Sequence, residues 1–271
     1  MMEPQLPIGI LDSGFGGLSV MRAVHAALPH ERLIYAADCG FAPWGDRTDD
    51  YINARVDAVV NFLVFQGIKA LVVACNTATA VAVARLRSSL PIPVVGIEPA
   101  VFPAVRETQA GKAGVLATVK TIASSKYCRL KAQALAWAAE NRPMPVEIID
   151  APCPGLMECV ERGEFHSPAT RALVERYVRP IALAGADRLV LGCTHYPFLA
   201  EEIARAAGPQ IKLIDPAPAV ARQLGRRLDE TGARRGSGLG ACTFYATDPT
   251  DARERVLKTL WNDSAVLRPL A

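Results

Sequence analysis

Residues 70–77 read Ala-Leu-Val-Val-Ala-Cys-Asn-Thr, and residues 188–195 read Arg-Leu-Val-Leu-Gly-Cys-Thr-His. Each stretch is a short apolar run that ends on a cysteine followed by polar residues. Similar runs alternate with longer helical patterns, such as residues 49–65 and 121–140, which is typical of βαβ units and a largely parallel sheet. Strands are predicted near residues 8–11, 32–36, 70–74, 94–97, 113–117, 146–149, 188–191, 211–214 and 243–245.

The chain also contains a weak internal repeat. Residues 9–13 resemble residues 114–118, and residues 97–100 resemble residues 214–217. Together with the two cysteine stretches, these matches fall in the same order in both halves. They predict an α/β protein of two similar doubly wound lobes with mainly parallel sheets and the active site in the cleft between them.

One predicted lobe is built from two separate segments of the chain and the other from a single segment. The first lobe is expected to comprise residues 1–98 and a C-terminal return, 213–271, and the second lobe residues 99–212. The return should add a helix, a strand and a last helix. A tail of this length is expected to pack back on a lobe rather than to fold alone.

Composition excludes several classes of protein. Of 271 residues, 51% are apolar and 21% charged, with a net charge of +3, which is an ordinary balance for a soluble globular protein. Acidic and basic residues are interspersed, so no nucleic-acid-binding face is expected. The densest basic cluster is interpreted as a solvated helix end and loop rather than a ligand site, and consists of Arg226, Arg227, Arg234 and Arg235.

Targeting features point to the cytoplasm. No apolar segment reaches the roughly 18 residues of a membrane span, and residues 1–4 lack the basic and apolar regions of a signal peptide. The seven cysteines are irregularly spaced, which fits free thiols in a reducing compartment.

Reactive side chains follow four predicted strands. They are Asp12 and Ser13, Asp38 with the segment 43–45, Cys75 with Asn76 and Thr77, and Cys193 with Thr194 and His195. Ligand sites of parallel sheets lie at the carboxyl ends of the strands, so facing lobes would bring the two cysteines to one cleft.

Two facing cysteines have a chemical use. Inversion of an α-carbon needs one group to remove a proton and a second group, on the opposite face, to return one. A cysteine with a pKa of about 8.5 can be thiol or thiolate near neutral pH. A strand-to-helix turn places the sulfur beside a helix N-terminus, which favours the thiolate and can also hold a substrate carboxylate.

Plainer interpretations stay open for each motif. A lone cysteine after an apolar strand is usually a core residue, and Cys193 with His195 could ligate a metal, although no spacing supplies further ligands. The glycine-rich turn after Asp12 fits neither the Gly-x-Gly-x-x-Gly pattern of dinucleotide-binding folds nor the P-loop pattern. Asp12 or Ser13 could simply cap a helix, and His195 could be structural.

The motifs resemble those of the glutamate racemases, within the aspartate/glutamate racemase superfamily. The similarity extends in order from about residue 8 to residue 219, and the two cysteine motifs are its most specific parts. The matching stretches are residues 11–17, 36–38, 43–45, 74–78 and 192–197, with a further similar segment at 160–163.

The resemblance implies a cofactor-independent racemase that binds L- and D-glutamate, needs no metal or pyridoxal phosphate, and supplies D-glutamate for peptidoglycan. It implies that Cys75 acts on D-glutamate and Cys193 on L-glutamate. Asp12 and His195 would assist the thiols, and Glu161 would support His195. The implied substrate-binding residues are Asp12, Ser13, Trp44, Gly45, Asn76, Thr77, Thr118, Thr121, Thr194 and His195.

Two departures from the family pattern bear on substrate preference. Trp44 stands where the family has tyrosine, and the segment after Ala117 has fewer glycines than usual. Both departures leave substrate preference open. The alternatives are a racemase of the same superfamily with another substrate, such as aspartate, a decarboxylase of this fold, a non-catalytic two-lobe binding protein, or a thiol-redox protein. The second cysteine motif argues against the binding protein, and the lack of a nearby resolving cysteine argues against the redox protein. Oligomeric state is left open, with a homodimer among the options.

Overall fold

The computed structural model describes residues 3–270, which form two compact units. Unit 1 comprises Met1–Ile97 and Ala217–Ala271, and unit 2 comprises Glu98–Pro216. The boundary expected after residue 212 falls inside a strand, Lys212–Ile214, that pairs within the sheet of unit 2. Met1 and Met2, which begin the stretch considered for a targeting signal, lie outside the described residues.

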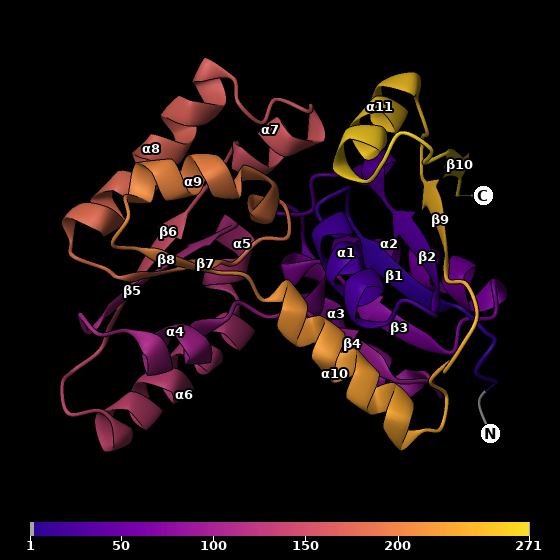
Figure 1. Cartoon of the computed structure of the whole chain (residues 1–271), viewed down its shortest axis with the longest axis horizontal. Coiled ribbons are helices and arrows are strands. Elements are labelled where there is room, and N and C mark those ends of the chain that lie inside the picture. Colours follow the sequence, from indigo (N-terminus) through magenta and orange to yellow (C-terminus); the bar gives the residue numbers. More distant parts are fainter. Residues whose placement is uncertain (1–2, 271) are drawn as a thin grey trace. The chain divides into compact units, whose positions relative to one another are not determined.

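Unit 1 is built on a six-stranded sheet of order β10-β9-β2-β1-β3-β4, in which the described pairings are parallel. The C-terminal return supplies its last two strands in the sequence, and β9 pairs directly with β2 (Figure 1). The strands are β1 (Ile8–Asp12), β2 (Arg32–Ala37), β3 (Ala70–Val73), β4 (Val94–Gly96), β9 (Ala241–Ala246) and β10 (Leu267–Pro269).

Helices cover both faces of this sheet. The helices α2 and α3 pack on one face around Leu11, Leu71 and Val73, whereas α1 and α10 lie side by side on the other (Figure 1). The helical segments are α1 (Leu18–Ala27), η1 (Cys39–Phe41), α2 (Asp49–Phe65), α3 (Asn76–Ser89), α10 (Ala217–Glu230) and α11 (Asp251–Leu260).

The helix α2 shows how local sequence fixes an element. Thr48 caps its N-terminus by accepting a hydrogen bond from the Tyr51 N–H, and two aspartates in the first turn complement the helix dipole. Apolar residues at helical spacing bury one face, from Ile52 to Leu63. Gly67, at a positive φ of 73°, then turns the chain into the next strand.

Unit 2 is a four-stranded parallel sheet of order β6-β5-β7-β8. The helices α4 and α6 pack around Val115 and Val190 on one face, and α8 packs against α9 as well as β5 and β6. The strands are β5 (Lys112–Ala117), β6 (Glu147–Pro152), β7 (Arg188–Leu191) and β8 (Lys212–Ile214), and the helical segments are α4 (Val101–Glu107), α5 (Val119–Ala123), α6 (Ser125–Asn141), α7 (Leu156–Glu161), α8 (Pro168–Leu183), η2 (Tyr196–Leu199) and α9 (Ala200–Ala207).

The first four strands of each unit have the same order in their sheet, which confirms the prediction of two similar α/β lobes with parallel sheets. In each sheet the first strand lies centrally, the second pairs on one side, and the third and fourth follow on the other side. The repeated sequence stretches therefore occupy matching places. Cys75 follows β3 and Cys193 follows β7, the third strand of each sheet.

Two sequence-based expectations were wrong in detail. The helix expected over residues 121–140 is two helices, α5 and α6, because the Ser124 hydroxyl accepts from the Tyr127 N–H and starts a new helix. The C-terminal return contains a further strand, β10, after its last helix. Within residues 3–270, no helix combines the length and the apolar character needed to cross a bilayer.

Candidate active site

In unit 1, Cys75 lies at the junction of β3 and α3 and caps the N-terminus of that helix. Its sulfur accepts a hydrogen bond from the Ala78 N–H at 3.5 Å, and the Ser13 hydroxyl lies 3.6 Å from the sulfur. Cys75 is 6% exposed, so the thiol is nearly enclosed. The amide and the helix dipole are both sources of positive potential that stabilise a thiolate.

The glycine-rich turn after β1 carries Asp12 and Ser13. Asp12 is fully buried, and its Oδ2 accepts a hydrogen bond of 2.6 Å from the Gly17 N–H at the start of α1. The carboxylate therefore does stabilise a helix start, as the plainer interpretation held. The same turn places Ser13 against the Cys75 sulfur, so the two roles are compatible.

Three predicted substrate-binding residues cluster with Cys75. Asn76 and Thr77 form the buried first turn of α3, and the Trp44 ring packs in the same hydrophobic cluster as Cys75. Within residues 3–270, neither amide atom of Asn76 nor the Trp44 Nε1 has a hydrogen-bond partner, although all three atoms are buried. Buried polar groups of this kind are normally paired, so these atoms are suited to binding a polar ligand. Gly45 follows Trp44 and is half-buried.

Asp38 has a structural explanation. The Arg55 guanidinium binds its carboxylate with two hydrogen bonds of 2.7 and 2.8 Å, and the Thr247 hydroxyl donates a third of 3.1 Å. The Asp38 hydrogen bond is the largest of the effects that raise the Arg55 pKa. Arg55 also lies over the Phe41 ring at 3.5 Å. This network holds the loop that leads to Trp44.

In unit 2, Cys193 belongs to a chain of three side chains. The Cys193 sulfur lies 3.5 Å from the His195 Nδ1, and the His195 Nε2 lies 2.6 Å from the Glu161 Oε1. The cysteine follows β7, the histidine precedes η2, and the glutamate ends α7. Glu161 and His195 are therefore in short contact, and the supporting role of Glu161 stays a prediction.

The environment of His195 favours the imidazolium. Burial by itself lowers the pKa of this histidine, but the hydrogen bond and charge of Cys193, with those of Glu161, raise the pKa well above its ordinary value. An imidazolium beside Cys193 can stabilise a thiolate or return a proton to it.

The threonines of unit 2 line neighbouring strand ends. Thr118 follows β5 and caps α5, where its hydroxyl accepts from the Thr121 N–H at 3.2 Å and contacts the Thr121 hydroxyl at 2.9 Å. Thr194, between Cys193 and His195, is 3% exposed. Thr118 and Thr194 follow the adjacent strands β5 and β7 of one sheet, where parallel sheets carry their ligands, and Thr121 lies one turn further on, in α5.

Sequence reasoning missed Tyr35, a fully buried tyrosine on β2 whose hydroxyl reaches the turn after β1. It also missed Tyr196, which is fully buried and whose hydroxyl donates to the Cys153 carbonyl at 3.5 Å. Tyr35 has no sequence signal, since an aromatic residue in a strand is typical of an ordinary core, whereas Tyr196 lies within the matching stretch 192–197.

Within residues 3–270, no group of three or more histidine, cysteine or acidic side chains is arranged to hold an ion. Cys153 is 2% exposed, and burial raises the pKa of its thiol to about 12. That thiol stays protonated near neutral pH. None of the seven cysteines, all of which lie within the described residues, forms a disulfide.

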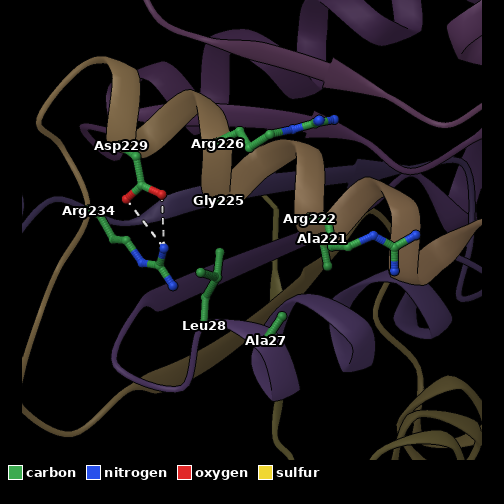
Figure 2. Close-up of a pocket in the computed structure, with 8 residues that line it drawn as sticks. All are labelled: Ala27, Leu28, Ala221, Arg222, Gly225, Arg226, Asp229 and Arg234. Atoms are coloured by element: carbon green, nitrogen blue, oxygen red, sulfur yellow. Dashed lines mark hydrogen bonds and ion pairs between the residues drawn. The ribbon is translucent and has the colours of Figure 1, made fainter.

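The arginine-rich part of unit 1 borders a pocket of about 370 Å³, and Figure 2 shows Ala27 and Leu28 beneath α10. Arg234 turns to Asp229 at 3.0 Å, whereas Arg222 and Arg226 extend along the outside of α10. The residues that line the pocket are Ala27, Leu28, Ala221, Arg222, Gly225, Arg226, Asp229 and Arg234. None is a predicted site residue, and the pocket's three arginines and Asp229 are exposed at the surface.

Comparisons with known proteins agree with these motifs. The family model described as Asp/Glu/hydantoin racemase matches residues 8–224. The glutamate racemase of Methylococcus capsulatus is 46% identical over 265 residues, covering 97% of this chain and 95% of that protein. A glutamate racemase from Bacillus anthracis superposes with a TM-score of 0.86 at 30% identity, covering 98% of each chain. The Escherichia coli glutamate racemase, solved with L-glutamate and an activator, gives a TM-score of 0.85 at 31% identity, covering 98% of each chain.

Proposed function

Since this chain belongs to the Asp/Glu/hydantoin racemase family, we propose that it interconverts L- and D-glutamate by two proton transfers at the α-carbon. Cys75 and Cys193 are the two acid/base groups, and no added cofactor takes part. The observation that carries the proposal is that both sulfurs stand at the same position of two matching sheets, each beside a group that stabilises a thiolate.

Glutamate is proposed as the substrate because the relatives that carry this name match nearly the whole chain. The Escherichia coli structure contains L-glutamate, and the Methylococcus protein is a glutamate racemase at 46% identity. The shared length leaves no large insertion or deletion that would build a different pocket.

The proposed reaction moves one proton off the substrate and another onto it. With D-glutamate, the Cys75 thiolate removes the α-proton and becomes a thiol, and the electron pair moves into the adjacent carboxylate as an enolate. The Cys193 thiol then gives its proton to the opposite face and becomes a thiolate. With L-glutamate the two sulfurs exchange roles, so each direction needs one thiol and one thiolate.

Neighbouring groups assist the two sulfurs differently. At Cys75, the Ala78 amide, the Ser13 hydroxyl and Asp12 on the same turn order the thiol. At Cys193, the imidazolium of His195 offsets the charge of the thiolate, and Glu161 holds that imidazolium in place. Hydrogen bonds to charged groups are stronger than those between neutral groups. Glu161 therefore affects proton transfer at Cys193 through its hydrogen bond to His195.

Substrate binding is assigned to polar groups at the strand ends of both units. In unit 1 the unpaired amide of Asn76 and the indole nitrogen of Trp44 are suited to a carboxylate or ammonium group. The full proposed set is Asp12, Ser13, Trp44, Gly45, Asn76, Thr77, Thr118, Thr121, Thr194 and His195.

The proposed physiological role is the supply of D-glutamate for peptidoglycan in the cytoplasm, as the resemblance to glutamate racemases implies. The oligomeric state stays open, with a homodimer among the options, and sedimentation equilibrium of the full chain measures it directly.

The primary test follows the circular dichroism of L-glutamate after the protein has been dialysed against a chelator and a carbonyl reagent. We expect the signal to decay to zero, since the product is an equal mixture of enantiomers. Activity that disappears on dialysis and returns with zinc or pyridoxal phosphate would contradict the mechanism.

Substrate choice and acid/base chemistry are tested in the same assay. We expect a higher kcat/KM for L-glutamate than for L-aspartate, and a preference for aspartate would overturn the substrate while leaving the fold intact. Because one sulfur must be a thiol and the other a thiolate, kcat/KM should be bell-shaped in pH. A profile that is flat from about pH 6 to 10 would contradict paired thiols, whose ordinary pKa is about 8.5.

A further inference from the structure

We propose that Tyr35 is a positioning residue for the Cys75 half of the reaction, acting through the turn that carries Asp12 and Ser13. The inference rests on the proposed role of Cys75 as an acid/base group. Tyr35 lies on β2, next to β1 in the sheet, and is fully buried. It has no place among the residues that the motifs assign to substrate or proton transfer.

The Tyr35 hydroxyl joins two points of the glycine-rich turn. It donates a short hydrogen bond of 2.6 Å to the Gly14 carbonyl oxygen and lies 3.3 Å from the Asp12 Oδ2. That carboxylate oxygen also accepts the Gly17 N–H at 2.6 Å. The hydroxyl therefore ties the middle of the turn and the carboxylate at its beginning to β2.

The same hydroxyl stands close to the strand end that carries Cys75. A Cβ placed on Gly17 would lie 2.9 Å from the Asp12 Cβ, 3.0 Å from the Ala74 Cβ and 3.0 Å from the Tyr35 hydroxyl. One point thus touches the turn, the tyrosine and the residue before Cys75. Such close packing leaves the turn one well-defined position relative to β3.

The position of the turn matters for the sulfur because Ser13 lies between the two residues that Tyr35 contacts. Its hydroxyl is 3.6 Å from the Cys75 sulfur. Without the Tyr35 hydroxyl, the Gly14 carbonyl and Asp12 lose one partner each, and the turn can shift. A displacement of a fraction of an ångström at Ser13 changes the geometry of proton transfer at Cys75, to which rates are sensitive.

A second buried tyrosine shows that a Tyr–Asp hydrogen bond alone does not imply this role. In unit 2 the Tyr127 hydroxyl donates to the Asp150 carboxylate, which is also paired with Lys131 at 2.7 Å. Tyr127 is 3% exposed, yet Asp150 lies on β6 and not in a cysteine-bearing motif. Tyr127→Phe is therefore a matched control that removes a buried hydroxyl of the same kind.

The experiment compares Tyr35→Phe with Tyr127→Phe. Because the equilibrium constant of a racemase is one, kcat/KM is the same in both directions for every variant, and a loss of rate cannot identify the affected half. The deuterium isotope effect on kcat/KM can identify the affected half, when it is measured separately with 2-deuterated D-glutamate and 2-deuterated L-glutamate. Each substrate labels the proton that a different cysteine removes.

For Tyr35→Phe we expect kcat/KM to fall on the order of tenfold, the scale of one lost hydrogen bond. Proton removal by Cys75 then limits the rate more strongly. The isotope effect should rise with deuterated D-glutamate and fall with deuterated L-glutamate. Tyr127→Phe should leave both isotope effects at their wild-type values.

Equal isotope effects in Tyr35→Phe and the wild type would overturn the proposal and leave Tyr35 a core residue. Should this variant not fold, Ser13→Ala replaces it, because loss of the hydroxyl that the turn brings to Cys75 must produce the same opposite changes; unchanged isotope effects there overturn the proposal equally. Cys75→Ser in the same assay distinguishes a failure of the two-cysteine mechanism from a failure of the Tyr35 proposal. If it retains racemase activity, the two-cysteine mechanism fails, whereas an inactive Cys75→Ser with unchanged isotope effects in Tyr35→Phe rejects Tyr35 alone.

Discussion

The Cys75 and Cys193 sites occupy equivalent positions in the two sheets but surround the sulfur differently. Cys75 caps α3, a helix of 14 residues, and contacts a backbone amide and a serine hydroxyl. Cys193 is followed by the short segment η2 and contacts the imidazole of His195. One site relies on a helix N-terminus and the other on an ionisable side chain.

This difference shows that a repeated backbone does not require repeated electrostatics. The strand order brings each sulfur to a strand end, and each local sequence then supplies its own source of positive potential. A helix dipole does not titrate, whereas an imidazolium does. Proton transfer at Cys193 should therefore respond to the ionisation of His195, whereas proton transfer at Cys75 should not.

The largest expected effect comes from removing either sulfur. Cys75→Ser and Cys193→Ser should each lower racemisation by roughly 10²- to 10⁴-fold, the usual contribution of a general acid or base. Residual α-proton exchange in deuterated water should favour D-glutamate in Cys193→Ser and L-glutamate in Cys75→Ser. Nuclear magnetic resonance of each enantiomer measures the exchange. Full activity in either variant would return that cysteine to a core role.

A smaller effect is expected from Glu161→Gln, which removes the charge beside His195. The loss of a hydrogen bond between charged groups costs about 1.5–3 kcal/mol, so kcat/KM should fall roughly ten- to a hundredfold. Without Glu161 the pKa of His195 is lower, and the alkaline limb of the kcat profile with L-glutamate should move to lower pH. An unshifted limb would show that Glu161 does not act through His195.

The same ionisation contributes to folding stability. The pKa of His195 is raised in the folded chain, so its contribution is fully present below the unfolded value of about 6.5 and is lost as the pH rises through the folded value. Urea unfolding of the wild type and Glu161→Gln should therefore differ most at acidic pH and converge at alkaline pH.

Residues before the two cysteines allow a comparison of packing. A Cβ on Gly192 would lie 2.7 Å from the Leu116 carbonyl oxygen, whereas Ala74 already carries one in the matching position. Gly192→Ala should lower the free energy of unfolding by about 1–3 kcal/mol through overpacking and displace Cys193. Ala74→Gly should cost about 1–2 kcal/mol, from a lost buried methyl and added backbone freedom. Urea midpoints and kcat measure both, and an active, fully stable Gly192→Ala would show that the strand shifts easily.

The smallest effect is expected at the arginine-lined pocket of unit 1. Arg234→Gln breaks an ion pair with Asp229 whose side chains are about half exposed, and such pairs contribute about 0–1 kcal/mol. Thermal unfolding should change little and kcat should not change. A large fall in kcat would show that this pocket communicates with the Cys75 site.

Much of this architecture could be predicted because its signals are local and repeated. Buried parallel strands are short apolar runs, and each cysteine follows one directly. The helix α2 matched its expected limits because Thr48 and Gly67 mark both ends. The contact between Glu161 and His195 was expected only through family resemblance, since the two residues lie in different elements.

Other features carry no local signal. The strand β10 has three residues, ends on a proline and forms only by pairing with β9. The break between α5 and α6 depends on one serine hydroxyl that competes with a continuous helix. Tyr35 resembles any core aromatic until β2 is placed beside β1. Each depends on contacts between residues distant in the sequence or on a single side chain.

The division of unit 1 between the two ends of the chain has a consequence for biosynthesis. Unit 2 is one continuous segment and has all its strands once Pro216 has left the ribosome. The sheet of unit 1 lacks β9 until nearly the whole chain has been made, because β9 comprises residues 241–246. This strand pairs along the full length of β2. The strand that carries Tyr35 is thus an open edge during translation, exposed to mispairing. A nascent chain therefore has every strand of the unit 2 sheet before it has every strand of the unit 1 sheet.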